Sequence, residues 1–100
     1  MGTLFYADQA IDIDDRTLAH LKVAVVTKLR RGESFTLSWA NGDERPSGRT
    51  TIWMQPSIPL RFEFLEPTPP PLRRDWIESI LRSANTTGGV QLTHEEPAPE

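Results

Sequence analysis

The two histidines, His20 and His94, are the side chains best suited to metal binding or to proton transfer near neutral pH. His20 falls in a stretch with helical hydrophobic spacing, and His94 falls among the acidic C-terminal residues. Neither has a nearby partner at the spacing of a metal-binding motif. We therefore interpret His20 as a helix-flank or core-edge residue, and the histidines predict no metal site.

Three aspartates, Asp12, Asp14 and Asp15, lie close together ahead of the first helical stretch. Carboxylate oxygens suit a hard cation, but the calcium-loop pattern with its glycine and distal glutamate is missing. Helix capping explains at least one of them more simply, because a carboxylate accepts the free N–H groups of a helix start. We predict that Asp14 or Asp15 is the N-cap.

Nucleophiles and phosphate-binding loops give no recognisable catalytic pattern. The chain has no cysteine, which removes thiolate nucleophiles, disulfides and cysteine zinc sites together. It has no Gly-x-Ser-x-Gly elbow, and no glycine-rich loop precedes a lysine; the pair Gly88-Gly89 alone is a weak signal. The sequence predicts no catalytic residue and no cofactor, and hence a protein that is not an enzyme.

Composition indicates one soluble globular domain. A chain of 100 residues with 37% hydrophobic and 25% charged residues can bury one core. No apolar run approaches the roughly 18 residues that cross a bilayer, and the first residues lack the pattern of a secretory signal. We expect a cytoplasmic protein with no membrane partner.

The net charge of -3 hides a segregation along the chain. Residues 1–15 and 85–100 carry only acids, whereas residues 16–84 have a net charge near +4. The excess can mark a surface that binds a polyanion, although a mild excess is also found on ordinary solvated surfaces. The residues of this candidate basic patch are Lys28, Arg30, Arg31, Arg73 and Arg74.

The most legible helix lies in the first third of the chain. It should begin at Asp14 or Asp15, continue with apolar residues three and four positions apart, and end at about Arg31. Basic residues crowd its last turn, where cations suit the helix dipole, and Gly32 can adopt the left-handed conformation that follows a helix. This pattern predicts an amphipathic helix that faces the core.

β-prone composition and the alternation of polar with apolar residues predict five strands. Residues 3–6 and 11–13 form an N-terminal hairpin in this interpretation. Residues 34–39, 49–54 and 60–65 alternate in the same way and are predicted to form three consecutive antiparallel strands. We expect these strands to build a mainly antiparallel sheet.

A proline-rich connector, residues 67–71, separates the strands from a second helix. A spacer within the domain is the simpler interpretation, and a ligand for a proline-binding domain is the alternative. The second helix should begin at Arg74 or Asp75 and close at Asn85, and residues 90–92 should add a short edge strand.

Together these elements predict an α+β fold of ββαβββα order with two helices packed on one face of the sheet. Residues 1–93 are expected to form a single domain, and residues 94–100, with two prolines and three glutamates, an acidic and flexible tail.

The sheet face that the helices leave uncovered is the candidate interaction surface. Strand alternation places Trp53 on that face among polar residues, where a large aromatic ring is unusual. A bulge in the strand, or a covering segment, would bury Trp53 instead. The predicted surface consists of Trp53, Arg49, Arg61, Thr51, Ser38 and Thr36.

Three blocks of sequence also carry a resemblance, and they span nearly the whole chain: RTLAHLKVAVVTKLRRGESFTLSW, TTIWMQPSIPLRFEF and RRDWIESILRSANTTGG. They resemble an actinobacterial family of proteins of about this length and of unknown function. Its members often carry the label ATP-dependent DNA ligase. Such ligases need a lysine in a Lys-x-Asp-Gly setting, whereas Lys22 is followed by Val-Ala-Val and Lys28 by Leu-Arg-Arg. The resemblance implies a stand-alone domain and not ligase chemistry.

The leading hypothesis from the sequence is therefore a non-enzymatic interaction domain that binds a protein partner, or forms a homo-oligomer, through Trp53 and its polar neighbours. The alternative is an accessory module that binds DNA or RNA through the candidate basic patch, with Arg49 and Arg61 in support.

Overall fold

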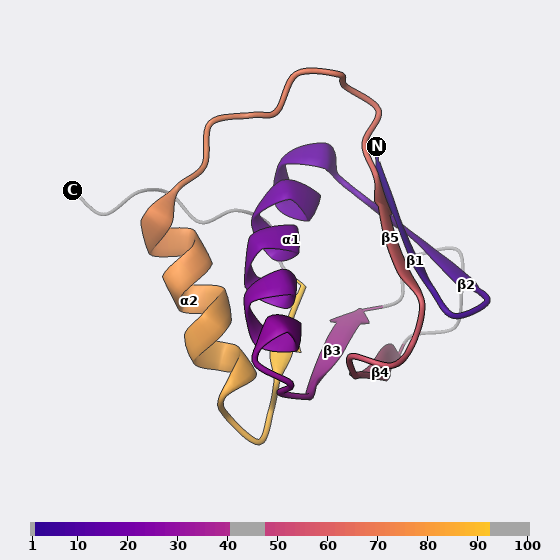
Figure 1. The fold of residues 1–100 in the computed structure, drawn as a ribbon, viewed down its shortest axis with the longest axis vertical. Coiled ribbons are helices and arrows are strands. Elements are labelled where there is room, and N and C mark those ends of the chain that lie inside the picture. Colours follow the sequence, from indigo (N-terminus) through magenta and orange to yellow (C-terminus); the bar gives the residue numbers. More distant parts are fainter. Residues whose placement is uncertain (1, 41–47, 93–100) are drawn as a thin grey trace.

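The computed structural model describes residues 2–40 and 48–92, which form an α+β fold with two helices and two three-stranded sheets (Figure 1). The elements follow the predicted order, with one short strand at the end: β1 (Gly2–Tyr6), β2 (Gln9–Ile13), α1 (Asp15–Arg30), β3 (Phe35–Ala40), β4 (Arg49–Met54), β5 (Leu60–Glu63), α2 (Arg74–Ala84) and β6 (Val90–Gln91). The predicted fold class and element order are confirmed.

Helix α1 begins and ends where its sequence predicts. The Asp14 carboxylate caps the helix and accepts the backbone N–H of Thr17 at 3.0 Å. At the other end Arg31 is the C-cap and Gly32 takes a φ of 72°, which is the left-handed conformation that glycine tolerates best. Local side-chain chemistry therefore sets both ends of this helix.

The first sheet has the strand order β2-β1-β5, and all of its pairs are antiparallel. Its N-terminal hairpin is confirmed, with Ala7 and Asp8 at the turn and a φ of 54° at Ala7. The second sheet has the order β4-β3-β6. Strands β3 and β4 form the predicted hairpin, whereas β6 runs parallel to β3.

The expectation that β5 continues the β3-β4 hairpin is wrong, because β5 pairs with β1. After β4 the chain turns at residues 55–58, where the Ile58 N–H donates to the Gln55 carbonyl at 3.4 Å. The carbonyl of Pro59 then accepts the Ala7 N–H at 3.1 Å, which joins the chain to the first hairpin. The prolines in this turn cannot donate to a continuing sheet, so the chain crosses to a different edge.

Helix α1 supplies the centre of the hydrophobic core. Its residues Leu18, Leu21 and Val25 are fully buried and belong to one cluster with residues from both sheets. Leu4 represents the first sheet and Leu37 the second, and both are fully buried as well. The helix thus covers the inward faces of two sheets that meet beneath it.

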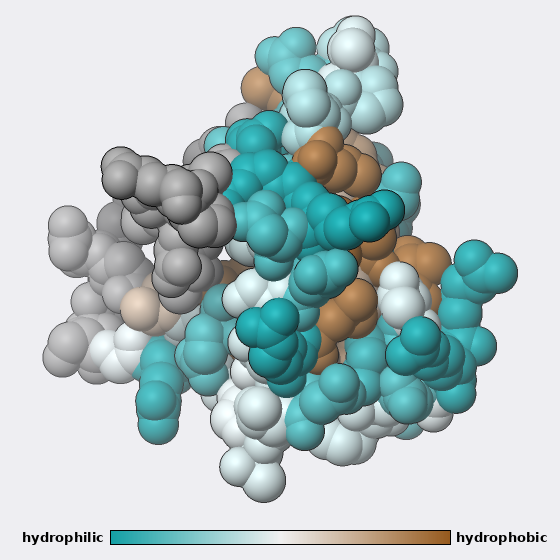
Figure 2. All heavy atoms as spheres, turned by 90° about the vertical axis from the view of Figure 1, so that its left-hand side faces the viewer, coloured by the Kyte–Doolittle hydropathy of each residue, from teal (hydrophilic) through white to brown (hydrophobic). Residues whose placement is uncertain are grey.

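Helix α2 lies beside α1 and runs in the same direction (Figure 1). It packs on α1 and on β6, but Ala84 is its only buried residue. Trp76, Ile77, Ile80 and Leu81 are half-buried. Figure 2 shows the face of the molecule that carries α2, where hydrophobic atoms lie between bands of polar ones.

The predicted acidic tail and the predicted cytoplasmic location stay predictions. The acidic tail, together with His94, lies outside the described residues, so the predicted domain end at residue 93 is untested. Neither described helix is long and apolar enough to span a membrane.

Candidate interaction surfaces

Five of the six residues of the predicted interaction surface lie on the outward face of the second sheet. We call this surface the open face and define it by Thr36, Ser38, Arg49, Thr51 and Trp53. Thr36 lies opposite Trp53, and Ser38 lies opposite Thr51, across the β3-β4 hairpin. The side chain of Trp53 is 56% exposed, which is the exposure that strand alternation predicts.

The floor of the open face is polar and closely packed. Ser38 is only 4% exposed, and its hydroxyl lies 2.7 Å from that of Thr51. Gly89, just before β6, lies close to Thr36. A Cβ atom on Gly89 would lie 2.6 Å from the Thr36 carbonyl oxygen. Small polar side chains therefore surround Trp53 on this face.

Arg61 does not belong to the open face, because its strand pairs with β1. It lies opposite Phe5 in the first sheet, and its guanidinium carbon lies 4.2 Å from the centre of the Phe5 ring. Its Nε atom lies 3.7 Å from the Glu63 carboxylate. Arg61 covers an aromatic ring of its own sheet and is not available beside Trp53.

Lys28, the first residue of the candidate basic patch, is 5% exposed. Its ammonium lies 3.0 Å from the Glu33 carboxylate and donates to the side-chain oxygen of Asn85, the C-cap of α2. A buried lysine with two such partners joins the ends of α1 and α2. It cannot contribute to an exposed basic surface.

The other four residues of the candidate basic patch lie at opposite ends of the helix pair. Arg30 and Arg31 are exposed at the end of α1, whereas Arg73 and Arg74 lie at the start of α2. Because the helices run in the same direction, the length of α1, about 24 Å, separates the two pairs. Arg73 also forms a 2.7 Å ion pair with Asp75, and this hydrogen bond lowers the pKa of the Asp75 carboxyl. The structure does not gather these residues into one patch.

His20 is a fully buried structural residue. Its Nδ1 atom lies 2.7 Å from the Arg16 carbonyl oxygen, and its Nε2 atom accepts the Arg73 N–H at 2.8 Å. The ring stacks on Trp76 with the ring centres 4.1 Å apart. This pattern requires a neutral ring with the proton on Nδ1. Both ring nitrogens are therefore used to hold the start of α2 against α1.

The three aspartates are occupied by structural contacts. Asp12 accepts the Thr3 hydroxyl at 3.2 Å, and Asp14 caps α1. Asp15 accepts the backbone N–H groups of Glu66 and Leu65 at 2.9 and 3.2 Å, and the Glu66 bond holds its pKa below the ordinary value. Within residues 2–40 and 48–92, no three histidine or acidic side chains lie together as metal ligands would.

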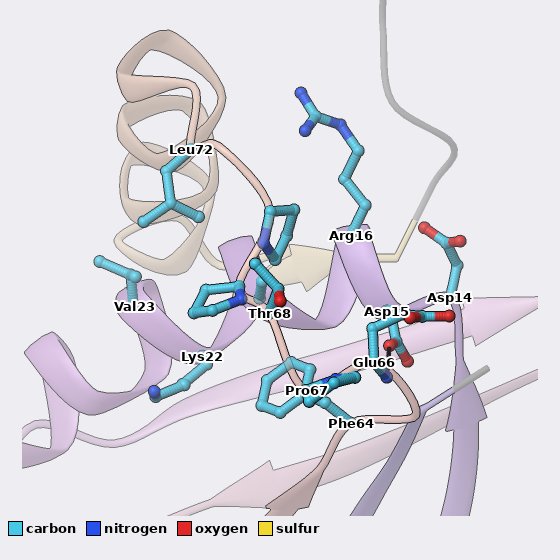
Figure 3. Close-up of a pocket in the computed structure, with 13 residues that line it drawn as sticks. Asp14, Asp15, Arg16, Lys22, Val23, Phe64, Glu66, Pro67, Thr68 and Leu72 are labelled. Carbon is cyan, nitrogen blue, oxygen red and sulfur yellow. Dashed lines mark hydrogen bonds between the residues drawn. The ribbon is translucent and has the colours of Figure 1, made fainter.

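A groove that the sequence did not predict lies between the N-terminal half of α1 and residues 64–72, which we call the strap (Figure 3). Its volume is about 400 Å³, within the range of small-molecule sites. Asp15, Arg16 and His20 hold the two ends of the strap to α1, since Arg16 donates to the Pro71 carbonyl at 2.9 Å.

Helix spacing is the signal that would have predicted these contacts. Arg16, His20 and Lys28 are separated by multiples of four residues, so they lie along one side of α1 next to its apolar stripe. We call this row the polar ladder. It faces the strap and α2, and each of its members binds a residue of that later segment.

Comparison with known proteins places the chain in a family. Residues 1–95 match the family described as Domain of unknown function (DUF7882), and the chain belongs to it. No curated protein and no solved structure matches the chain. Membership agrees with the expected family of unknown function, whereas the actinobacterial origin and the ligase label stay predictions.

Proposed function

We propose that this member of the family is a non-enzymatic interaction domain that binds a protein partner, or a second copy of itself, through the open face. The observation that carries the proposal is the 56% exposure of Trp53 among the polar residues of the open face. Tryptophan is enriched among residues that dominate binding energy, because its ring removes a large area from water while two torsions are fixed.

The surroundings of Trp53 favour a reversible protein contact. Thr51 and Arg49 precede it on the same face of β4 at intervals of two residues, so Arg49 lies about 13 Å from Trp53. An apolar anchor with polar and charged residues around it is the usual arrangement of a non-obligate interface. These neighbours keep the uncomplexed face compatible with water.

The edge of β4 supports contact through the face more than addition of a strand. The Tyr6 hydroxyl donates to the carbonyl of Trp53, so the first sheet occupies the β4 edge at that residue. A partner strand pairing along β4 would lose this position. A partner that packs its side chains on Trp53 from above meets no such obstacle.

The proposal is tested with three alanine variants. Trp53→Ala should weaken association by about thirtyfold, the effect of a residue worth at least about 2 kcal/mol. Arg49→Ala should weaken it by a smaller factor, and Arg61→Ala, the matched control in the other sheet, should leave it unchanged. Analytical ultracentrifugation measures self-association, and calorimetry with a captured and purified partner measures heterologous binding.

Two results would contradict this assignment. If Trp53→Ala unfolds the protein in circular dichroism, Trp53 is a structural residue. If Arg61→Ala weakens binding as much as Arg49→Ala, the interface is not the open face.

The positions of the basic side chains weaken the alternative that the protein binds nucleic acid. Lys28 is buried, and the exposed arginines at the two helix ends are far apart. Binding to generic DNA or RNA that falls steeply with salt would still favour it, because phosphate contacts release counterions. Absence of such binding at low salt leaves the protein-binding proposal as the stronger one.

A further inference from the structure

The groove under the strap is preformed, because stiff chain and polar contacts hold its walls apart. Four prolines in residues 67–71 restrict the backbone of the strap. Asp15 fixes one end through the N–H groups of residues 65 and 66, and Arg16 and His20 fix the other end. A groove that is pinned at both ends does not need to be opened by its ligand.

The lining of the groove is mainly apolar, and part of it is left exposed. Val23 and Phe64 are half-buried, and Leu72 is 50% exposed at the end of the strap. Ala19 and the rings of Pro67 and Pro70 complete the apolar wall. This surface would be removed from water by a ligand with an aliphatic or aromatic body.

The charges around the groove are distributed unevenly. Asp14, Asp15 and Glu66 lie toward one end, and Lys22 lies toward the other (Figure 3). Asp14 and Asp15 accept hydrogen bonds from the backbone, and Arg16 donates to the strap. Asp14 therefore serves as the helix cap, and Asp15 and Arg16 hold the strap to α1.

Lys22 is the exposed lysine on this rim, and a wall residue, Phe64, is the aromatic ring beside it. Its ammonium lies 5.9 Å from the centre of the Phe64 ring, and it takes part in no ion pair within the described residues. A cation at one end and acids at the other select the sign and the direction of a ligand. An anionic head group is attracted to Lys22 and repelled from the far end.

We propose that the groove binds small anionic amphiphiles, with the apolar body under the strap and the carboxylate on Lys22. The α1 residues that line it, from Asp14 to Val23, extend about 13 Å along the helix axis, which suits a medium-chain carboxylate. This site is separate from the open face, and neither proposal depends on the other.

The test titrates the whole chain with decanoate, and with decylammonium as the probe of opposite charge, below their micelle-forming concentrations. Amide signals in two-dimensional NMR should shift and saturate at Ala19, Val23 and Leu72, and stay unchanged at Thr51 and Trp53. Decanoate should bind at least about tenfold more tightly than decylammonium, the effect of one favourable charge contact.

Lys22→Glu should lower decanoate affinity by about tenfold or more, by the same charge argument. Arg30→Glu is the matched control, because Arg30 is an exposed base two turns further along α1 and does not line the groove. It makes the same change in net charge and should leave decanoate affinity within about twofold, since exposed charges at that separation are screened.

Val23→Trp should fill the groove and abolish decanoate binding while the melting temperature is retained. Leu72→Trp, at a more exposed position, serves if the first variant does not fold. Equal affinity for the two probes, equal effects of Lys22→Glu and Arg30→Glu, shifts centred on Trp53, or no saturable binding would each overturn the proposal.

Discussion

The outward faces of the two sheets each carry one aromatic ring, and they treat it differently. On the first sheet the Phe5 ring is half-buried beneath the guanidinium of Arg61, 4.2 Å away. On the second sheet Trp53 is 56% exposed and lies opposite the short side chain of Thr36. Arg61 covers the smaller ring, whereas the short Thr36 lies opposite the larger one.

This difference shows that strand alternation alone cannot identify a binding surface. Alternation places Phe5 and Trp53 equally on outward faces. What distinguishes them is the residue on the neighbouring strand, which is Arg61 for Phe5 and Thr36 for Trp53. Strand pairing therefore decides which exposed ring is free to meet a partner.

The largest expected effect comes from breaking the second sheet at Gly89. A Cβ atom there would lie 2.6 Å from the Thr36 carbonyl oxygen, and the φ of 69° strains any other residue. Gly89→Ala should lower the free energy of unfolding by at least about 2 kcal/mol, since strain and overlap add. Thermal unfolding measures the change, and loss of open-face binding should accompany it.

Gly32→Ala is the control for that variant. Gly32 has a similar φ of 72° but no atom within 4 Å of an added Cβ. Only the left-handed conformation is penalised there, by about 1 to 2 kcal/mol, so its melting temperature should fall less. Equal losses for the two variants would show that the contact between Gly89 and Thr36 does not matter.

A smaller effect separates the two rings directly. Phe5→Ala should destabilise the protein by about 1 to 2 kcal/mol, because it removes half-buried apolar area and the Arg61 contact. Trp53→Ala should cost less than about 1 kcal/mol although the ring is larger, because much of it is already in water. Chemical denaturation ranks the two, and the reverse order would refute the distinction between a covered and an uncovered ring.

The smallest expected effect depends on pH and concerns the chain that leaves the first sheet. Asp15 binds the N–H groups of residues 65 and 66 just after β5, and its pKa is lowered in the folded state. A lowered pKa stabilises the fold above the unfolded value of about 3.9, and that contribution disappears as pH falls through the folded value. Asp15→Asn should therefore melt lower than the wild type at pH 7, with a gap that closes on acidification below pH 4. A gap that widens in acid would contradict this assignment.

Local signals in the sequence were sufficient for most of the fold. The cap at Asp14 and the glycine at position 32 mark the ends of α1, β-prone runs locate the first hairpin, and two-residue alternation locates the second. These features depend on residues a few positions apart. They can be recognised without knowledge of the rest of the chain.

Contacts between distant segments were not predictable in the same way. The pairing of β5 with β1 joins residues more than fifty positions apart, and nothing in the alternation of β5 distinguishes that edge from the edge of β4. The predicted pairing with β4 places Arg61 near Trp53, whereas Arg61 lies over the ring of Phe5. This difference also shows why five open-face residues were grouped correctly, since all of them lie on one local hairpin.

The residues of the candidate basic patch do not lie together, and the reason is related. The sequence places Lys28 both at a helix end and in the candidate basic patch, but Lys28 is buried and its ammonium contacts Asn85 and Glu33. His20 was expected at a core edge and is fully enclosed, because Trp76 and the N–H of Arg73 cover it. The three partners from the second helix region, Arg73, Trp76 and Asn85, lie over fifty residues away, beyond the reach of spacing rules.

The polar ladder has a consequence for the order in which the chain assembles. Its contacts from Arg16, His20 and Lys28 join residues separated by 55, 53 and 57 positions. Closing such long loops has a high entropic cost before any contact is gained, so we expect these bonds to form after the local hairpins and α1. Ala84 is the only residue of α2 that is buried, so α2 contributes little to the core. We therefore expect the strap and α2 to dock onto α1 late in folding.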